Sequence, residues 1–420
     1  MAAGLGLRRW GQRLLARALA CGLRSAAIKT IHQEFQVSFR YPVHFTSGLF
    51  DLGNPLFHEV IRDGGGELPK KLLAVVDRGL YHYHPDLPAD LEEYCRAHAE
   101  VIALTGAPLL LPGGEAVKND PLHVTILHQA ILAAGLCRHS YVAAIGGGAL
   151  IDTVGLAAAT AHRGVRLIRV PTTVLAQADA AIGVKNSVNA MGQKNFLGVF
   201  TPPAAVLNDS GFLTTLSQKD WIGGVAEAVK VALIKDAAFF ALLERQARGL
   251  ARRDLRAMRQ VIYRCAALHL DHIASSGDPF EHGSLRPLDF GHWAAHRLEL
   301  LSGFELGHGE AVAIGLALDT TYSYLAGLLG ERPWRRVLDL LTTLGFSLYV
   351  PQLDNQEAIL RGLEEFRTHL GGRLTILLLS DIGRGLETNE IDPGTLGAAL
   401  EELRGFAPAV WPAVQPALAS

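Results

Sequence analysis

The stretch YVAAIGGGALIDTVGLAAATA, residues 141–161, combines a short apolar segment, three consecutive glycines and a second apolar segment of helical length. Glycines let the backbone approach a pyrophosphate, and a helix N-terminus supplies unpaired N–H groups and a favourable dipole. The order predicts a strand, a turn and a helix in a nucleotide-binding α/β domain. The spacing does not match GxGxxG, and glycines often serve such turns for geometry alone, so a purely structural turn is the alternative.

The neighbouring segments predict further strands of the same sheet. Lys71–Asp77 is a short apolar run that ends in an acid, and Val165–Val170 runs into Pro171-Thr172-Thr173. Such runs are typical of buried parallel strands whose carboxyl ends face a ligand. The polar, glycine-rich stretch 176–200 follows, and we interpret it as a loop. Its lysines and amides suit a phosphate-bearing anion, although an ordinary solvated loop is the alternative.

The composition is that of a globular enzyme with about two domains. The chain has 420 residues, of which 49% are hydrophobic and 19% charged. A net charge of −2 predicts no general attraction to nucleic acid, and no apolar run reaches the roughly 18 residues that a membrane span needs. Four cysteines without a CxxC pair indicate free thiols in a reducing compartment. We therefore expect a cytoplasmic protein without a nucleic-acid or membrane partner.

Residues 1–33 are basic and contain no acidic residue before Glu34. This pattern is typical of an organellar transit peptide, and a disordered basic arm on a cytoplasmic protein is the alternative. After the pair Pro202-Pro203 the pattern changes from strands to helices. The expected organisation is a basic arm at 1–33, a nucleotide-binding α/β domain at 34–203 and a helical domain at 204–420.

Three histidines gather in PLDFGHWAAHRLELLSGFELGHGE, residues 287–310. His292 and His296 are four residues apart and share one face if this segment is helical. His308 follows in a glycine-flanked turn and could fold back onto that face. Such histidines, completed by a distant carboxylate, suggest a divalent metal site. The alternative is a surface helix that carries histidines by chance.

Together these motifs resemble those of the sugar phosphate cyclases, and most clearly of 3-dehydroquinate synthase. The matching stretches occur in one order between about residues 70 and 385: GGGALID (146–152), RVPTTVLAQAD (169–179), QKN (193–195), GVAEAVK (224–230), DFGH (289–292) and HGEAVAIG (308–315). The resemblance implies a Rossmann-like NAD-binding α/β domain followed by an all-α metal-binding domain. It also implies a carbon–oxygen lyase that uses NAD and zinc or cobalt.

The resemblance assigns roles residue by residue. It implies a metal site of Glu227, His292 and His308, and catalytic roles for Asp179, Lys185, Lys230 and His296. The implied NAD-binding residues are Asp77, Glu115, Lys118, Gly147, Gly148, Asp152, Thr172, Thr173, Phe212, Thr215 and Leu216. The implied substrate-binding residues are Lys194, Asn195, Arg286, Asp289 and Arg163. In the family, the position of Arg163 reaches into a neighbouring subunit's site, which implies a homodimer.

The chain departs from the dehydroquinate synthase pattern at two positions that bear on the substrate. Asp289 stands where the family has asparagine, and a lysine that the family places before the metal helix falls near Asp271. An acid in place of a lysine should weaken the binding of a substrate carboxylate. The pattern is therefore nearer to the valiolone synthases, and it also resembles a synthase-like protein of the Ebo operon. The alternatives are a metal-dependent polyol dehydrogenase of the glycerol type and a catalytically silent scaffold.

Overall fold

The computed structural model describes residues 30–275, 280, 289–369 and 374–406. The chain divides into two units, Met1–Phe39 and Arg40–Ser420. Residues 30–39 contain no helix or strand, so all the elements below belong to the second unit. None of the helices that the structure describes is long and apolar enough to cross a bilayer.

A seven-stranded parallel sheet forms the first half of the second unit. Its strand order is β1-β9-β6-β5-β2-β3, and β4 also pairs with β2. The bounds are β1 Val43–Thr46, β2 Lys70–Asp77, β3 Ile102–Leu104, β4 Leu109–Leu111, β5 Tyr141–Gly146, β6 Arg166–Pro171 and β9 Ala205–Asp209. The segments predicted as strands at 71–77, 141–145 and 165–170 are confirmed as β2, β5 and β6.

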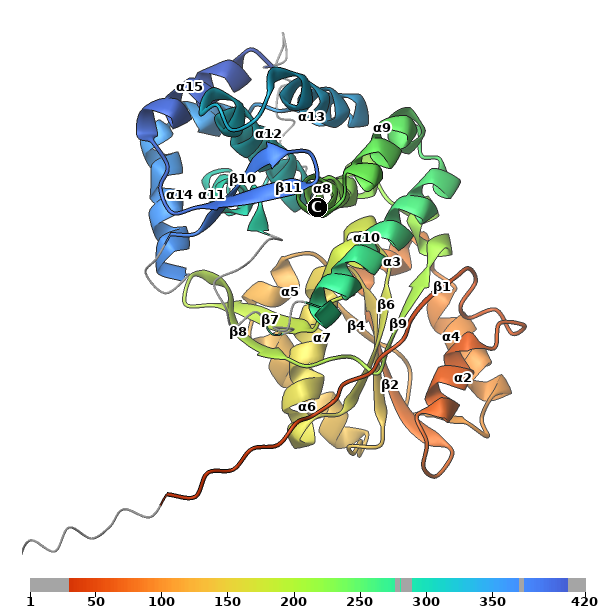
Figure 1. Cartoon of the computed structure of the whole chain (residues 1–420). Helices are drawn as coiled ribbons and strands as arrows, with labels where there is room; N and C mark the ends of the chain where they lie inside the picture. The colour runs from red at the N-terminus through yellow and green to blue at the C-terminus, as the bar shows by residue number, and fades with distance from the viewer. Residues whose placement is uncertain (1–29, 276–279, 281–288, 370–373, 407–420) are drawn as a thin grey trace, which may run out of the picture. The chain divides into compact units, whose positions relative to one another are not determined.

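Helices cover both faces of the sheet because successive side chains of a strand point to opposite faces. Leu72, Ala74 and Val76 pack with α2 (Leu56–Asp63) and α4 (Leu87–Ala97). Leu73 and Val75 pack on the other face with α6 (Leu122–Ala133) and α7 (Gly148–Thr160). Figure 1 shows the two helix pairs on either side of the strands. The strands are therefore buried on both faces, as their continuous apolar runs predict.

Strand β9 corrects the expected domain boundary. It lies beyond Pro202-Pro203, yet it pairs with β1 and β6 inside the sheet. The division at residue 203 therefore falls within the sheet-forming part of the chain. The two prolines lie in the connection that leads into β9 and do not mark the end of a domain. Ala204, the residue immediately after them, donates its N–H to Leu167 O of β6 (2.7 Å).

The segment expected to be a loop at 176–200 contains an antiparallel hairpin. Its strands are β7 (Lys185–Ala190) and β8 (Gln193–Phe200), and Met191 and Gly192 at its tip have positive φ angles of 53° and 74°. The polar composition hid this hairpin, because most of β8 is exposed and lacks the apolar face of a core strand.

Helices dominate the remainder of the chain. They are α8 (Gln218–Lys235), α9 (Ala237–Ala251), α10 (Leu255–Ser275), α11 (His292–Leu301), α12 (His308–Leu325), α13 (Glu331–Leu344), α14 (Gln356–His369) and α15 (Pro393–Arg404). This part is not purely helical, because β10 (Ile376–Asp381) and β11 (Arg384–Thr388) form a second hairpin. Helices α8, α11 and α12 share one large apolar core, which fixes these helices relative to one another.

Candidate functional site

Three neighbouring strands bring predicted NAD-binding residues to one edge of the sheet. Asp77 ends β2, Gly147 follows β5, and Thr172 follows β6. Gly79 N donates to Asp77 Oδ1 (2.8 Å), and Thr172 N donates to Gly146 O (3.0 Å). Burial raises the pKa of Asp77 despite the backbone N–H groups that face it. The carboxyl ends of adjacent parallel strands meet here, where α/β sheets commonly bind ligands.

The glycine turn leaves the start of α7 open. Gly147 precedes the helix in an extended conformation, and no side chain of the described residues caps the helix there. A Cβ at Gly147 would lie 3.5 Å from the Thr173 Cγ2 atom, and one at Gly148 would lie 3.0 Å from the Ala180 Cβ atom. The free N–H groups at this end suit a nucleotide pyrophosphate.

The other predicted NAD-binding residues fall into two groups. Phe212 and Thr215 lie in the turn Ser210–Thr215, just before Leu216. There His84 contacts Thr215 Oγ1 through Nε2 (2.8 Å) and places its ring 5.4 Å from that of Phe212. This histidine was not predicted.

The second group, in α7 and the short helix Ala116–Asn119 with its cap Glu115, contacts the β7–β8 hairpin. The buried Lys118 ammonium pairs with Asp152 Oδ2 (2.7 Å) and donates to Asn195 Oδ1 (2.5 Å). Glu115 Oε1 accepts from Asn189 Nδ2 (2.7 Å). Asn195, expected at the substrate phosphate, therefore directs its amide oxygen to a residue expected at NAD.

The buried Arg169 braces the chain just before the hairpin. Its guanidinium donates to the carbonyl oxygens of Ala181 (2.9 Å), Gly183 (2.6 Å) and Lys185 (3.0 Å), and to Asn186 Oδ1 (2.8 Å). Lys185 itself is exposed at the start of β7. The position of this predicted catalytic lysine thus depends on a residue that sequence reasoning did not single out.

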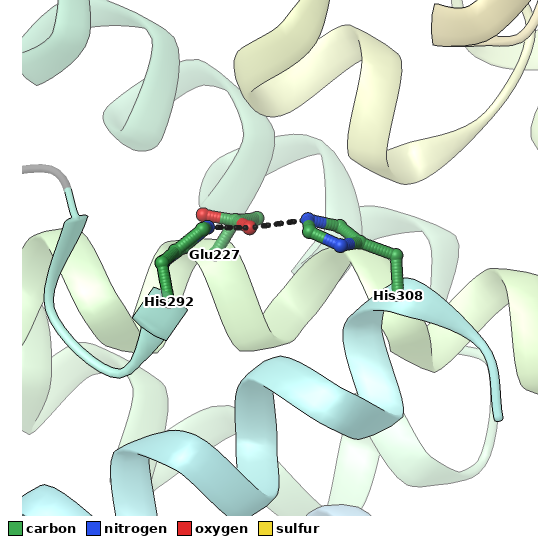
Figure 2. Close-up of side chains that lie close together, drawn as sticks. All are labelled: Glu227, His292 and His308. Atoms are coloured by element: carbon green, nitrogen blue, oxygen red, sulfur yellow. Dashed lines mark ion pairs between the residues drawn. The ribbon is translucent and has the colours of Figure 1, made fainter. Parts of the chain in front are cut away.

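Glu227, His292 and His308 converge in the helical part (Figure 2). Glu227 lies within α8 and is 1% exposed, while His292 and His308 are the first residues of α11 and α12. Both imidazole Nε2 atoms lie 3.3 Å from Glu227 Oε1. The remaining ring nitrogens are also engaged, His292 Nδ1 with Phe290 O (3.1 Å) and His308 Nδ1 with Glu299 Oε1 (3.3 Å).

Local geometry explains why the two histidines begin helices. Gly291 has φ +76°, and a Cβ there would lie 2.8 Å from the backbone nitrogen of Leu316. Only glycine fits this left-handed, close-packed position. Glu310 Oε2 accepts from Gly307 N (2.8 Å) and so caps the start of α12.

The donor set fits a divalent metal. One atom from each of Glu227, His292 and His308 lies within 4.8 Å of the other two. One carboxylate and two imidazoles are the ligands of many catalytic zinc sites, which keep a further position open for water or substrate. A second set, His296, Glu299 and His308, satisfies the same distance limit. In that set the Lys194 ammonium lies 3.0 Å from Glu299 Oε1, so a lysine contacts the glutamate of each set, as Lys230 does at Glu227.

Lys230 and Asp179 extend the charged cluster. Lys230 is 2% exposed and its ammonium contacts Glu227 Oε2. Burial lowers the pKa of Lys230, but Glu227 and Asp179 outweigh burial and raise that pKa above its usual value. Burial likewise raises the pKa of Asp179, yet Lys230 and His269 bring it to about 2. Asp179 is therefore a carboxylate at neutral pH.

His269 corrects one interpretation of the sequence. Its Nδ1 lies 2.5 Å from Asp179 Oδ1, whereas Asp271 is exposed. Residues that are two positions apart on a helix point about 200° apart. His269 and Asp271 therefore cannot face the same site. The acid near the expected lysine position therefore lies away from the site, and it gives no argument about a substrate carboxylate.

Glu299 is a further residue that the sequence prediction missed. It lies on α11, one turn after His296, and contacts both His308 and Lys194. Burial raises the pKa of Glu299, but those two neighbours bring it to about 2. Burial and the nearby His292 hold the pKa of His296 well below its usual value, so this imidazole is neutral. The spacing His296–Glu299 was the only sequence signal for this carboxylate.

The remaining predicted substrate residues have different outcomes. Asp289 is partly buried and close enough to Lys230 to help raise the pKa of that lysine. Arg286 lies outside the described residues. Arg163 is exposed in the turn after α7, with φ +62°, and lines a surface depression with Cys137 and Arg138 rather than joining the charged cluster.

Comparison with known proteins identifies close relatives. Residues 108–223 match the model of the 3-dehydroquinate synthase N-terminal domain, and residues 224–363 match that of its C-terminal domain. The chain is 37% identical to a 3-dehydroquinate synthase from Coxiella burnetii, over 70% of this chain and 81% of the relative. It is 33% identical to that of Paracoccus denitrificans, over 90% of this chain and 100% of the relative.

A solved structure extends the comparison to the fold. A 2-epi-5-epi-valiolone synthase from Streptomyces hygroscopicus, with NAD⁺ and Zn²⁺ bound, has a TM-score of 0.79 and 30% identity. The match covers 89% of this chain and 99% of that structure. The expected fold class, an α/β domain followed by a helical domain, is confirmed.

Proposed function

Since the chain belongs to the 3-dehydroquinate synthase-like sugar phosphate cyclases, we propose that it binds NAD and zinc or cobalt. In this proposal it eliminates phosphate from a sugar phosphate and closes a carbocycle. The observation that carries the proposal is the convergence of His292 and His308 on one oxygen of Glu227, with Lys230 at the other oxygen. This arrangement combines metal ligands with a cation suited to an oxyanion.

Each cofactor has a set of residues that suits it. Glu227, His292 and His308 would hold the metal, and the sheet edge around Asp77 and Gly147 would hold NAD. When bound, NAD⁺ would supply reversible hydride transfer at a secondary hydroxyl, and the metal would supply polarisation of that oxygen. Because the hydride returns, the expected net change is phosphate release and ring closure.

The chain's own residues would bind the phosphate and orient the substrate hydroxyls. Lys230, Lys194 and the neutral His296 would bind the phosphate oxygens and stabilise the charge that develops as phosphate leaves. Asp179 is ionised and hydrogen-bonded to His269, so it would accept a hydrogen bond from a substrate hydroxyl and hold that hydroxyl in place. Lys185 would orient the neighbouring hydroxyls.

We further propose that the substrate carries no carboxylate beside Lys230. Asp289 is close enough to that lysine to raise its pKa. A substrate carboxylate in this region would meet the charge of Asp289 and be repelled. A ketose phosphate such as sedoheptulose 7-phosphate brings only its phosphate, which Lys194, Lys230 and His296 would bind, whereas the seven-carbon phospho-acid used by dehydroquinate synthases brings a carboxylate as well.

The test is incubation of the purified chain with NAD⁺, Zn²⁺ or Co²⁺, and each of these two substrates. Phosphate release without lasting NADH is the expected result, with sedoheptulose 7-phosphate preferred. Lasting NADH from a polyol would instead support the dehydrogenase alternative. Activity on neither substrate, nor on a wide panel of sugar phosphates, would overturn the proposal and favour a scaffold.

We also propose a homodimer in which Arg163 acts in the partner's site. This proposal is supported by the family position of Arg163 and by its exposure away from its own chain's charged cluster. Arg163→Ala and Lys230→Ala would each be inactive alone. Mixing them should restore activity at sites that combine the two intact residues, and no recovery in a verified mixed dimer would contradict the proposal.

A further inference from the structure

Glu299 lies between two groups to which the proposed function gives separate tasks. We propose that Glu299 is a positioning residue that couples metal binding at His308 to anion binding at Lys194. In this arrangement an arriving anion takes Lys194 from Glu299, and the carboxylate then holds His308 more strongly for the metal. The inference rests on the proposed function for the metal and phosphate tasks of these residues.

The contacts of Glu299 join the two groups directly. Its carboxylate is buried, with the side chain 6% exposed. Oε1 lies 3.3 Å from His308 Nδ1, while Oε1 and Oε2 lie 3.0 and 3.2 Å from Lys194 Nζ. His308 directs its other nitrogen to Glu227 Oε1 (3.3 Å). A continuous path thus runs from the lysine through Glu299 and His308 to the candidate metal ligands.

The contact between Glu299 and His308 is of a kind that is known to affect how a histidine binds a metal. A histidine that binds a metal through one nitrogen commonly donates its other N–H to a carboxylate, which orients the ring and raises its basicity. Oε1 of Glu299 faces both His308 and Lys194. The ammonium withdraws negative charge from the oxygen that His308 needs, so the lysine weakens the histidine as a ligand.

The lysine end is able to exchange partners. Lys194 lies on the exposed strand β8, and its side chain is 27% exposed. By contrast, the side chain of Lys230 is 3% exposed beside Glu227. A tetrahedral dianion offers the Lys194 ammonium a stronger partner than one carboxylate does. Glu299 would keep His308 as a partner after the exchange, so its buried charge would not be left uncompensated.

The experiment measures binding without turnover. The full chain is titrated with Co²⁺ against a competing chelator, with and without inorganic phosphate, and its visible cobalt spectrum is recorded. The variants are Glu299→Gln and Lys194→Gln. The matched control is Glu365→Gln. Glu365 lies on α14 and pairs with Arg297, which is on α11 as Glu299 is. The Glu365 side chain is 55% exposed and lies outside the charged cluster.

The proposal expects four results. Glu299→Gln weakens Co²⁺ binding by about 10- to 100-fold and shifts the cobalt spectrum. Phosphate tightens Co²⁺ binding in the wild type, and this gain is reduced in both site variants. Metal-free Glu299→Gln binds phosphate more tightly than the wild type does, because Lys194 has lost its competitor. Glu365→Gln behaves as the wild type.

Several results would overturn the proposal. Wild-type cobalt affinity and spectrum in Glu299→Gln would make the residue structural only. An unchanged phosphate effect in Glu299→Gln would assign the coupling to direct attraction between metal and anion. Two cobalt ions per chain, reduced to one in Glu299→Gln, would make Glu299 a metal ligand. If circular dichroism shows that this variant does not fold, Lys194→Gln decides, and a retained phosphate effect there refutes the coupling.

These measurements separate the coupling from the proposed reaction. A wild-type chain that shows the phosphate effect but transforms no sugar phosphate would refute the proposed function and leave the coupling intact. A chain that cyclises its substrate without the phosphate effect would refute only the coupling.

Discussion

Arg169 in the sheet region and Lys230 in the helical region are both buried cations, but their acceptors differ. The Arg169 guanidinium donates to backbone carbonyls and one amide, and burial lowers its pKa to about 10. Lys230 contacts the Glu227 carboxylate, and its carboxylate neighbours raise its pKa despite burial. A buried cation whose acceptors are neutral, such as Arg169, holds the backbone of the chain segments that it contacts. Ionised acceptors form a charge cluster whose balance a metal or an anion is able to change.

The largest effect is expected from removing the central charge of the cluster. Glu227→Gln removes the negative charge on which His292 and His308 converge and replaces one carboxylate oxygen with an amide NH2 group. We expect zinc or cobalt affinity to fall by more than about 100-fold, since a direct ligand matters more than a residue behind one. Metal analysis after dialysis and the rate of phosphate release measure the effect.

The matched control for this variant is Glu244→Gln. Glu244 pairs with Arg336 between α9 and α13, outside the cluster. It should retain full metal content. A Glu227→Gln protein with full metal content and activity would show that the ligand assignment is wrong.

Arg169→Met tests the brace and should have the next largest effect. The variant leaves three carbonyl oxygens and the Asn186 amide oxygen without their donor. We expect the free energy of unfolding to fall by about 3–5 kcal/mol, measured by urea denaturation. Arg169→Lys keeps the charge but loses the planar fork, so it should recover only part of the loss. A loss below about 1 kcal/mol in Arg169→Met would contradict the role as a brace.

Asp319 sharpens the comparison, because this buried carboxyl group of the helical region accepts N–H groups rather than facing a cation. It accepts from Gly291 N and Trp293 Nε1, both at 2.9 Å. Burial raises its pKa to about 7, despite these two hydrogen bonds. Between pH 4 and 7 the folded chain therefore keeps a proton that the unfolded chain releases, and stability falls as pH rises through this window.

Asp319→Asn should remove that dependence. Relative to the variant, the metal-free wild type should lose about 2 kcal/mol of unfolding free energy between pH 5 and 8. Urea denaturation at the two pH values measures the difference. Asp339→Asn changes an exposed carboxyl group on α13 and serves as the control. Parallel pH profiles for the wild type and Asp319→Asn would contradict the raised pKa.

Arg336→Gln should have the smallest effect. Arg336 donates to both oxygens of Glu244 at 2.9 and 2.7 Å, but the two side chains are 40% and 30% exposed. Solvent screens such a pair, so we expect the free energy of unfolding to change by about 0–1 kcal/mol. A loss as large as that of Arg169→Met would show that burial does not explain the contrast between the buried and the exposed cations.

Much of the α/β part was predictable because its signals are local. The segments predicted as strand and helix at 141–145 and 149–161 are confirmed as β5 and α7. Apolar runs and glycine positions act over a few neighbouring residues. The β7–β8 hairpin was missed because its pairing, rather than an apolar face, defines it. The boundary at 203 failed for a similar reason, since β9 is recognised as part of the sheet only through its partners.

Some residues of the candidate site were predicted from local motifs, and others were missed because their contacts are not local. The motifs singled out Glu227, His292 and His308, which converge in the structure. Arg169, Glu299 and His269 were missed, because each acts through partners on other elements. His269 is the clearest example, since Asp179 lies 90 positions earlier in the chain. Spacing within one helix carries no information about such a contact.

The sequence by itself determined strands β2, β5 and β6, helix α7, the glycine turn and the residue types of a metal site, because these depend on side-chain period and local backbone freedom. Only the tertiary structure decided which buried charges face one another. It paired His269 with Asp179, and Glu299 with both His308 and Lys194. The physical reason is that the energy of a buried charge depends on its distance to partners and on the removal of water, and both are set by packing between distant segments.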